Sequence, residues 1–233
     1  DLARQAAATG QRVIYSLAGR TKAKAIPDVS NRTGGFGGAQ LLAKYLHDND
    51  VAAVIDATHA YAAQISSNAE FACRAAGKPL LRLEAPPWEP DHGDHWIPVD
   101  DIPAARDSAI NIAKRIFVTT GRQDMAPFAT DTRCWWLARV IAPGDDLPSL
   151  ANGQYVYARG PFEAEDEVAL MREHGIGAVI SKNAGGAATY AKIAAARELS
   201  LPVIMVSRPP PGNAPTVATI EDALAWLALT FAA

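Results

Sequence analysis

The stretch that decides the fold is Ile176–Arg208, with the sequence IGAVISKNAGGAATYAKIAAARELSLPVIMVSR. The apolar run Ala178–Ile180 predicts a buried strand. From Ala187 onward, apolar side chains recur about once per helical turn, which predicts a helix. Val203–Val206 predicts the next strand. A strand, a helix and a strand in this order form a βαβ unit, so we expect the two strands to be parallel.

Lys182 lies in the loop that follows the first of these strands. Ligands of open α/β sheets bind beyond the carboxyl ends of the strands, and this position therefore favours a chemical role for Lys182. Gly185 and Gly186 in the same loop would let the backbone approach a bulky or anionic ligand. An ordinary solvated loop lysine is the alternative interpretation.

The composition limits the kind of protein. The 233 residues, 49% of them hydrophobic, are enough for one large core or two smaller ones. Lys and Arg number 22 against 25 Asp and Glu, and the net charge of −3 argues against a nucleic-acid partner. The longest apolar run, Ala223–Ala233, is too short to span a membrane. Two cysteines make no disulfide framework and no secretory segment is evident, so we expect a cytoplasmic protein.

The first residues, Asp1–Ala8, resemble the middle of a helix that begins without a cap. In an α/β protein, a strand and a Gly-rich turn usually precede such a helix. We therefore expect the first strand, and the turn that would bind a cofactor pyrophosphate, to lie upstream of residue 1.

The predicted strand Val13–Ser16 ends in a loop that indicates a nucleotide site. In a Rossmann-like unit, an acid at the end of the second strand favours NAD, whereas a cation there favours NADP. This loop contains a hydroxyl, a cation and no acid, which favours NADP if Asp1–Gly10 is the first helix. A solvated basic loop is the alternative. The candidate cofactor residues are Ser16, Leu17, Ala18, Gly19, Arg20 and Thr21.

A second candidate loop, Gly34–Gly38, has the sequence GGFGG and precedes a predicted helix at Ala39–His47. Its four glycines allow unusual backbone angles or close approach of a ligand, and a helix N-terminus attracts anions. A plain flexible loop is the competing interpretation. The candidate cofactor residues here are Gly35, Phe36, Gly37 and Gly38.

Polar side chains also follow the predicted strand Val51–Ile55. We predict that they line the cofactor site, although His59 could be structural or catalytic and Thr58 could instead cap the next helix. The candidates are Asp56, Ala57, Thr58, His59 and Tyr61.

Between the two halves of the chain, Asp91–Trp96 contains two His and two Asp. A metal site is one interpretation, but the residues share a Gly-containing loop and no third ligand cluster is evident, so an exposed interdomain connection is favoured. Pro98–Ala104 carries acids and prolines without an apolar period and is predicted to be a linker. The expected domains are therefore 1–97, which binds the cofactor, and 105–233, which binds the substrate.

The second domain repeats the pattern of polar residues after predicted strands. Arginine suits carboxylate ligands because its guanidinium can bind them with two hydrogen bonds, whereas an exposed helix face is an alternative for Lys192. The simplest architecture is an α/β protein with two Rossmann-like, doubly wound parallel-sheet domains and a ligand cleft between them. The candidate substrate residues are Thr119, Thr120, Gly121, Arg122, Gln123, Arg159, Gly160, Pro161, Ser181, Asn183, Gly185, Gly186 and Lys192.

Taken together, the strand-end segments resemble the precorrin-6A reductase family of cobalamin biosynthesis. Each motif alone is weak, but the ordered set is specific and covers nearly the whole chain. The segments are SLAGRT (16–21), GGFGG (34–38), DATHAYA (56–62), PLLRLEAPPW (79–88), TTGRQ (119–123), RGPF (159–162), SKNAGG (181–186) and TYAKIAAARELSLPVIMVSRP (189–209).

The resemblance implies an NADPH-dependent oxidoreductase that reduces one ring double bond of precorrin-6A, a tetrapyrrole with many carboxylates, to give precorrin-6B. Two features depart from the family pattern. A first strand with a GGT-type turn is absent from the chain, and His59-Ala60-Tyr61 stands where the family usually has His-Pro-Tyr. The second change leaves the polar groups in place.

Reduction by hydride transfer requires the nicotinamide near the accepting carbon, with water excluded. A nearby cation or proton donor stabilises the electron density that develops in the acceptor. Lys182 is the candidate for this catalytic role, or it pairs with a substrate carboxylate. Asp56, His59 and Tyr61 are alternative proton donors.

Two other functions are compatible with these patterns. One is a non-redox tetrapyrrole-binding or cyclising protein of the uroporphyrinogen-synthase type, with two lobes and no nicotinamide. The other is an NADP-binding regulatory domain without turnover. The sequence leaves open whether the substrate carries cobalt and how many copies of the chain associate.

Overall fold

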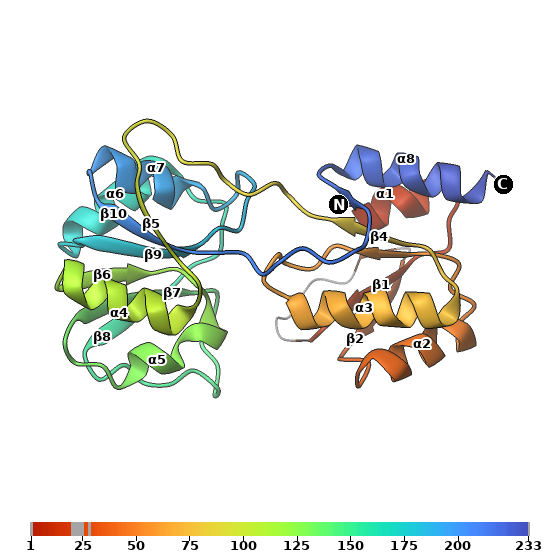
Figure 1. Cartoon of the computed structure of the whole chain (residues 1–233), viewed down its shortest axis with the longest axis horizontal. Coiled ribbons are helices and arrows are strands. Elements are labelled where there is room, and N and C mark those ends of the chain that lie inside the picture. The colour runs from red at the N-terminus through yellow and green to blue at the C-terminus, as the bar shows by residue number, and fades with distance from the viewer. Residues whose placement is uncertain (1, 20–25, 28, 233) are drawn as a thin grey trace. The chain divides into compact units, whose positions relative to one another are not determined.

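The computed structural model describes residues 2–19, 26, 27 and 29–232. Arg20 and Thr21 of the predicted cofactor loop lie outside the described residues. The chain forms two compact units, of which unit 1 is Asp1–Ala85 with Pro209–Ala233 and unit 2 is Pro86–Arg208 (Figure 1).

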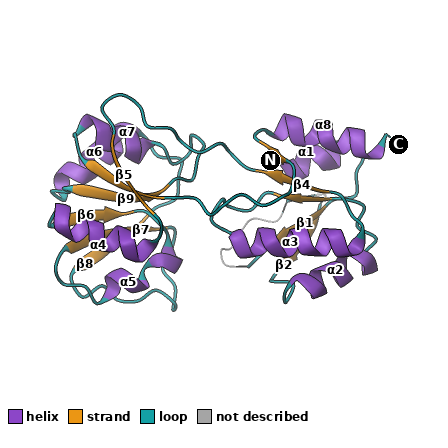
Figure 2. Cartoon of the chain, viewed as in Figure 1, coloured by secondary structure: helices purple, strands orange, loops and turns teal. Residues whose placement is uncertain are grey.

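Both units contain helices and parallel strands (Figure 2). Unit 1 contains helices α1 (Leu2–Ala8), α2 (Ala39–Asp48), α3 (Ala63–Ala76) and α8 (Ile220–Phe231), and strands β1 (Ile14–Leu17), β2 (Ser30–Thr33), β3 (Val54–Asp56), β4 (Leu80–Leu83) and β11 (Thr216–Val217). Unit 2 contains helices α4 (Ile102–Ile112), α5 (Ala126–Ala129), α6 (Ala164–Glu173) and α7 (Ala191–Glu198), the 3-10 helix η1 (Arg122–Asp124), and strands β5 (His95–Val99), β6 (Arg115–Val118), β7 (Trp135–Val140), β8 (Gly153–Tyr157), β9 (Ala178–Lys182) and β10 (Pro202–Val206).

Unit 2 is built on one six-stranded sheet with the strand order β5-β10-β9-β6-β7-β8. Within the described part of the chain, every recorded strand pair in this sheet is parallel. Val203 of β10 lies opposite Val179 of β9, and helix α7 connects the two strands. The predicted βαβ unit is therefore confirmed.

The side chains of this sheet alternate between two apolar layers, as the pleat of a strand requires. Phe117, Val179 and Val203 belong to one buried cluster together with side chains of α6 and α7. Their strand neighbours, such as Ile116 and Ile180, are also fully buried and therefore point to the opposite face, which α4 covers through its contacts with β9 and β10. Helices lie on both faces of the sheet (Figure 1).

The connections of this sheet reverse direction between β6 and β9. From β6 the chain continues to its neighbour β7, whereas from β9 it continues to β10 on the other side. This point of reversal is where open α/β sheets bind their ligands, beyond the carboxyl ends of the strands. The residues that follow β6 and β9 are therefore the best-placed candidates in unit 2.

Unit 1 contains two smaller parallel sheets, β1-β2 and β11-β4-β3. Helices α2 and α3 pack together over a core that includes Leu46, Ala72 and Cys73. Helix α8 contacts α1 and β4. The predicted cap of α8 is confirmed, because the Asp222 amide donates a hydrogen bond of 3.1 Å to Oγ1 of Thr219.

The structure divides the chain differently from the predicted 1–97, 98–104 and 105–233. His95–Val99 is the edge strand β5 of unit 2, and Ile102–Ile112 is a helix, so the predicted linker is part of a folded unit. The last residues return to unit 1, because Thr216 pairs with Arg82 of β4. Pairing between distant strands, which no local pattern reveals, sets these boundaries.

In the described residues, no helix is long and apolar enough to cross a membrane. The same residues contain no group of three or more His, Cys, Asp and Glu side chains placed to hold a metal ion. In the predicted Asp91–Trp96 segment, Asp94 forms hydrogen bonds of 3.0 and 2.9 Å with Arg197, and His95 begins strand β5. This segment is thus tied to α7 and the sheet, and it is not an exposed interdomain connection.

Candidate functional site

An ion pair bridges the two strands at the point of reversal in unit 2. Lys182 ends β9, and its Nζ lies 2.6 Å from Oδ2 of Asp124, which ends η1 after β6. Gly121 begins this turn with φ 97°, a backbone angle that glycine tolerates without strain. The side chains of Lys182 and Asp124 are 19% and 17% exposed, so the pair is partly shielded but reachable. The predicted catalytic lysine therefore has a carboxylate partner that sequence reasoning missed.

The two threonines after β6 have different roles. Thr119 donates its hydroxyl to the Ile180 carbonyl at 2.9 Å, which ties β6 to β9. Thr120 is buried, and its hydroxyl has no hydrogen-bond partner among the described residues. A buried polar group without a partner is costly and marks a place where water or a ligand supplies the missing bond. Thr120 thus remains a good candidate for a ligand contact.

Arg122 is already used by the protein itself. Its guanidinium lies 2.9 Å from Oδ1 of Asp146 and donates a 3.0 Å hydrogen bond to the Ala142 carbonyl. Its planar fork is therefore directed at the loop after β7. Gln123 and Arg159 are exposed, and Arg159 precedes a cis peptide bond between Gly160 and Pro161.

The loop after β9 is held by its polar side chains. Ser181 is fully buried and donates to the Lys182 carbonyl at 3.0 Å. The Asn183 side chain accepts a hydrogen bond from the Trp88 amide at 2.7 Å and donates one to the Trp88 carbonyl at 2.9 Å. Gly185 and Gly186 have φ angles of 73° and 71°, which other residues rarely adopt.

Lys192 lies inside unit 2. Its side chain donates a 2.6 Å hydrogen bond to the Thr189 carbonyl, and Nζ lies 4.9 Å from the centre of the Trp88 ring. Burial, together with the nearby positive charge of Arg139, lowers the pKa of Lys192 to about 7. Lys192 is 4% exposed, so the alternative of an exposed helix face is wrong.

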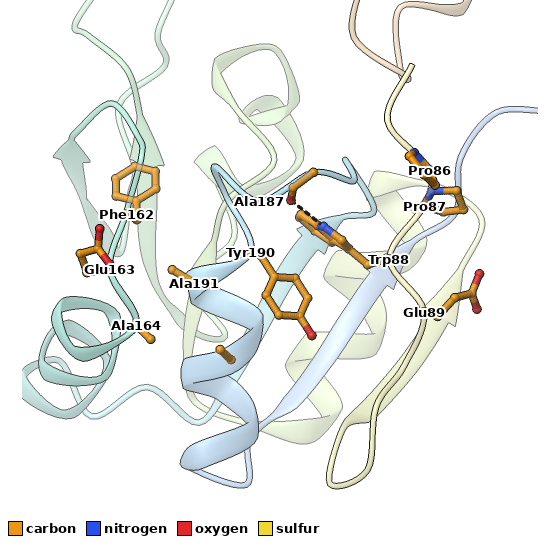
Figure 3. Close-up of a pocket in the computed structure, with 12 residues that line it drawn as sticks. Pro86, Pro87, Trp88, Glu89, Phe162, Glu163, Ala164, Ala187, Tyr190 and Ala191 are labelled. Carbon is orange, nitrogen blue, oxygen red and sulfur yellow. Dashed lines mark hydrogen bonds between the residues drawn. The ribbon is translucent and has the colours of Figure 1, made fainter. Parts of the chain in front are cut away.

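Unit 2 also has an apolar pocket of about 700 Å³ beside the loop after β9 (Figure 3). Three aromatic side chains, Trp88, Phe162 and Tyr190, contribute to its walls. The Trp88 indole donates to the Gly186 carbonyl at 2.8 Å, and Arg197 donates to the Tyr190 hydroxyl at 2.5 Å. These contacts hold the walls in place before any ligand arrives.

In unit 1, Arg32 organises the Gly-rich loop. Its guanidinium donates to the carbonyls of Gly34 and, at 2.9 Å, of Gly35, and to Oγ of Ser16 at 3.3 Å. It also lies 3.7 Å from the centre of the Phe36 ring. The loop after β2 and the end of β1 therefore both contact the Arg32 guanidinium.

The glycines of this loop are needed for different reasons. Gly37 has φ 81°, and a Cβ atom added there would lie 2.7 Å from Cδ1 of Leu41. Gly38 has φ 111° and precedes α2, whose N-terminus receives no side-chain cap within the described chain. Gly19, after β1, has φ 84°.

The loop after β3 is built on a buried ion pair. Asp56 accepts hydrogen bonds from the Thr58 amide at 3.0 Å, the Thr58 hydroxyl at 2.6 Å and Arg82 at 2.8 Å. Arg82 also contacts Glu84 and Ser66. Asp56 thus accepts all three of these hydrogen bonds and shapes the loop.

Two further expectations concern the residues after Asp56. Helix α3 begins after Ala62, so the alternative that Thr58 caps this helix is wrong. His59 and Ala57 are exposed, and Nδ1 of His59 accepts a 3.2 Å hydrogen bond from the Tyr61 amide. The rings of His59 and Tyr61 lie 5.6 Å apart. These side chains line the outer surface of the loop.

Three residues with clear structural roles at these sites, Asp124, Arg32 and Arg82, were not predicted. Asp124 follows the TTGRQ segment directly and could have been included by extending the strand-end rule one residue further. Arg32 and Arg82 lie within strands, and no sequence signal distinguishes them from ordinary strand residues.

Comparison with known proteins agrees with the resemblance. The family model described as precorrin-6x reductase CbiJ/CobK matches residues 1–228. The chain is 42% identical over 219 residues to the precorrin-6A reductase of Rhodococcus erythropolis, which covers 94% of this chain and 88% of the relative. It is 39% identical over 227 residues to that of Rhodobacter capsulatus, covering 97% and 90%.

A solved structure described as CobK precorrin-6A reductase superposes with a TM-score of 0.91 at 39% identity, covering 99% of this chain and 92% of that one. The matched region therefore includes the Gly-rich loop of unit 1 and the ion pair of unit 2. The chain belongs to the precorrin-6x reductase family, the oxidoreductases that act on a precorrin ring in cobalamin biosynthesis.

Proposed function

We propose that the chain uses NADPH to reduce one ring double bond of precorrin-6A and forms precorrin-6B. The observation that carries this proposal is the pair of Lys182 and Asp124 at the reversal point of a parallel sheet. Unit 1, as a Rossmann-like unit, would hold the cofactor, and the strand-end loops of unit 2 would contact the substrate. A reductase of this family requires a source of hydride, which implies a nicotinamide cofactor.

The residues of unit 1 fit a phosphorylated nicotinamide cofactor. The candidate cofactor segments Ser16–Thr21 and Gly34–Gly38 contain no acid. Arg32 places a cation beside Ser16 and Gly35. Gly34 and Gly38 have positive φ angles and open space where a Cβ atom would lie, so the backbone there can approach a ligand closely. These features favour NADPH over NADH, because the additional phosphate of NADPH requires a cation and no nearby carboxylate.

In unit 2, Lys182 would supply the proton that completes the reduction. Reduction of a double bond adds a hydride to one atom and a proton to the other, and the bound nicotinamide supplies the hydride. The Lys182 ammonium can donate its proton to the atom that gains electron density, and Asp124 keeps the ammonium oriented. After the step, the neutral amine recovers a proton from water, since its side chain is partly exposed.

The Thr120 hydroxyl and the exposed Arg159 would contact the substrate directly. Thr120 offers a buried hydrogen-bond group, and Arg159 offers a cation for the carboxylates of the tetrapyrrole. We assign the substrate as the cobalt-free precorrin, because relatives that are 39 to 42% identical carry the name precorrin-6A reductase.

The test is an anaerobic assay of the full-length protein with precorrin-6A, in which NADPH and NADH oxidation are followed side by side. We expect loss of NADPH that depends on the substrate, and a slower reaction with NADH. Tight binding of the tetrapyrrole without oxidation of either cofactor would instead support the non-redox alternative.

The role of Lys182 is tested by the substitution Lys182→Ala. We expect kcat to fall by about 10² or more, since a positioned proton donor contributes about 10² to 10⁴. Lys114→Ala is the matched control. Lys114 is an exposed lysine of unit 2 that directly precedes β6, and it therefore lies at the amino-terminal end of the strands, opposite the end that carries Lys182. Equal activity of the two variants would remove Lys182 from the mechanism.

A further inference from the structure

Asn183 directly follows Lys182 and contacts both ends of unit 2. The chain enters unit 2 at Pro86 and leaves it after Arg208. Trp88 and Arg208 therefore lie in the two segments through which the chain enters and leaves this unit. Asn183 makes hydrogen bonds to each of them.

The entering segment is held by the Asn183 side chain. Its amide oxygen accepts from the Trp88 amide at 2.7 Å, and its amide nitrogen donates to the Trp88 carbonyl at 2.9 Å. Both main-chain groups of Trp88 are thus paired, as they would be with a residue of a neighbouring strand. Here the partner is the side-chain amide of Asn183. The Trp88 indole adds a third bond, of 2.8 Å, to the Gly186 carbonyl. Three bonds thus tie the entering segment to the loop after β9.

The leaving segment is held by the Asn183 main chain. The carbonyl of Asn183 accepts a 2.7 Å hydrogen bond from Nε of Arg208. The amide of Asn183 lies 3.4 Å from the Val206 carbonyl, which extends the pairing of β9 with β10 one residue beyond Lys182. Both segments therefore meet at the peptide that follows Lys182.

This arrangement changes the interpretation of Asn183. Its side chain uses its oxygen and its nitrogen to hold Trp88, which gives it a structural task beside the predicted substrate contact. The residues after Asn183 include Gly185 and Gly186, and glycine restricts the backbone conformation less than other residues do. The backbone position of Lys182 therefore depends on the bonds of its neighbour.

We infer that Asn183 is a positioning residue, which anchors both ends of unit 2 to the peptide that carries Lys182 and so keeps Lys182 in contact with Asp124. This inference rests on the proposed function of Lys182. It predicts that loss of the Asn183 amide lowers the rate of the chemical step through the position of Lys182.

The first experiment is the substitution Asn183→Ala in the full-length protein, with steady-state kinetics. We expect kcat to fall about tenfold or more, because a shift of about 1 Å in a catalytic group can cost about 10². KM for NADPH should change less than about twofold. In a Lys182→Ala background the same substitution should have little further effect on kcat, because residues that act as one unit are not additive.

Asn152→Ala is the matched control for a purely structural asparagine. Its side chain donates to the carbonyls of Cys134 at 2.8 Å and Thr132 at 3.3 Å, next to the first residue of β8 and therefore away from the strand ends that carry Lys182. We expect a comparable loss of thermal stability without a fall in kcat. Equal falls in kcat for Asn152→Ala and Asn183→Ala, or full additivity with Lys182→Ala, would overturn the inference.

A second measurement does not depend on turnover. Hydrogen exchange of the backbone amides of Trp88, Glu89 and residues 183–187 should become faster in Asn183→Ala, and not in Asn152→Ala. If the native protein shows no reductase activity, the proposed function fails while this exchange experiment still tests the anchoring. Unchanged exchange in both segments would refute the anchoring itself. Should Asn183→Ala fail to fold, Asn183→Asp, which keeps the acceptor for the Trp88 amide, replaces it in both experiments.

Discussion

Two carboxylate–cation pairs lie at the carboxyl ends of parallel strands, one in each unit. In unit 1, Asp56 and Arg82 are 2.8 Å apart, and their side chains are 5% and 11% exposed. In unit 2, Asp124 and Lys182 are 2.6 Å apart and are 17% and 19% exposed. The first pair is enclosed by Thr58, Ser66 and Glu84, whereas the second closes a strand end at which ligands of such sheets bind.

The difference between the pairs shows that a position at the carboxyl end of a strand does not by itself indicate a catalytic role. Arg82 donates hydrogen bonds to three neighbours, Asp56, Glu84 and Ser66, so its pair holds the loop together. A lysine has a compact ammonium that can release a proton when its surroundings change. The residue type and the remaining exposure therefore favour a structural role for the first pair and agree with the catalytic role that we propose for the second.

The largest expected effect comes from replacing Lys182, which we propose as the proton donor, by the residue type that stands in the pair of unit 1. Lys182→Arg keeps the positive charge beside Asp124 but cannot release a proton near neutral pH. We expect kcat to fall by about 10² to 10⁴, with a much smaller change in KM for the substrate. Steady-state kinetics measures both constants. A variant with at least half of the native kcat would mean that charge alone is required at this position.

The next effect concerns the structural pair. Asp56→Asn keeps the shape of the side chain but removes the charge that balances Arg82, and should lower the free energy of unfolding by about 2 kcal/mol. Urea unfolding followed by circular dichroism measures this loss. The matched change Asp124→Asn should cost less than about 1 kcal/mol, because that pair is more exposed, while lowering kcat about tenfold. The reverse pattern would contradict the assignment of the two pairs.

A third prediction contrasts buried Arg82 with buried Lys192, which can titrate. Burial and the charge of Arg139 lower the pKa of Lys192 from 10.5 to about 7 in the folded chain. Between these values the unfolded chain binds more protons than the folded one, so Lys192 makes stability rise with pH by up to about 1.4 kcal/mol per unit. Below the folded pKa, the cost of burying the ammonium is fully present.

Lys192→Met should remove this dependence. Its advantage in unfolding free energy over the native protein should therefore be greatest near pH 6 and shrink by about pH 9. Urea unfolding of both proteins across this range provides the measurement. A constant difference between the two proteins would show that Lys192 does not titrate in this interval.

The smallest effect tests the open loop of unit 1. Gly37→Ala forces a residue with a Cβ atom to adopt φ 81° and places that atom 2.7 Å from Leu41. We expect NADPH binding to weaken about fivefold, which corresponds to about 1 kcal/mol. Gly35→Ala is the control, since a Cβ atom at Gly35 meets no described atom within 4 Å and its φ is not positive. Calorimetric titration should rank the two variants in this order.

Several elements could be predicted because their signals are local. The strands that flank α7, the helix after the Gly-rich loop and the cap at Thr219 follow from apolar runs and residue types within a few positions. Strand β2 was missed because Ser30–Thr33 has no apolar run and belongs to a sheet of only two strands.

The sequence predicts a connection and a linker where the structure has strand β5, because the strand contains Pro98. It lies at the edge of the six-stranded sheet, where proline is tolerated because its missing N–H group would face away from the neighbouring strand. The acid and proline that follow are a helix start, since Asp101 accepts a 2.8 Å hydrogen bond from the Ala104 amide and caps α4. Only the position of a strand in its sheet separates these interpretations.

By itself, the sequence determined the α/β class, the strand-end loops and, through the order of its motifs, the resemblance to precorrin reductases. These properties depend on residue types and spacings within short segments. The tertiary structure alone decided that Asp124 pairs with Lys182, that the Asn183 amide holds Trp88, and that α8 returns to unit 1. Such contacts depend on the order of strands in a sheet, which arises from packing among distant segments and leaves no periodic trace in the sequence.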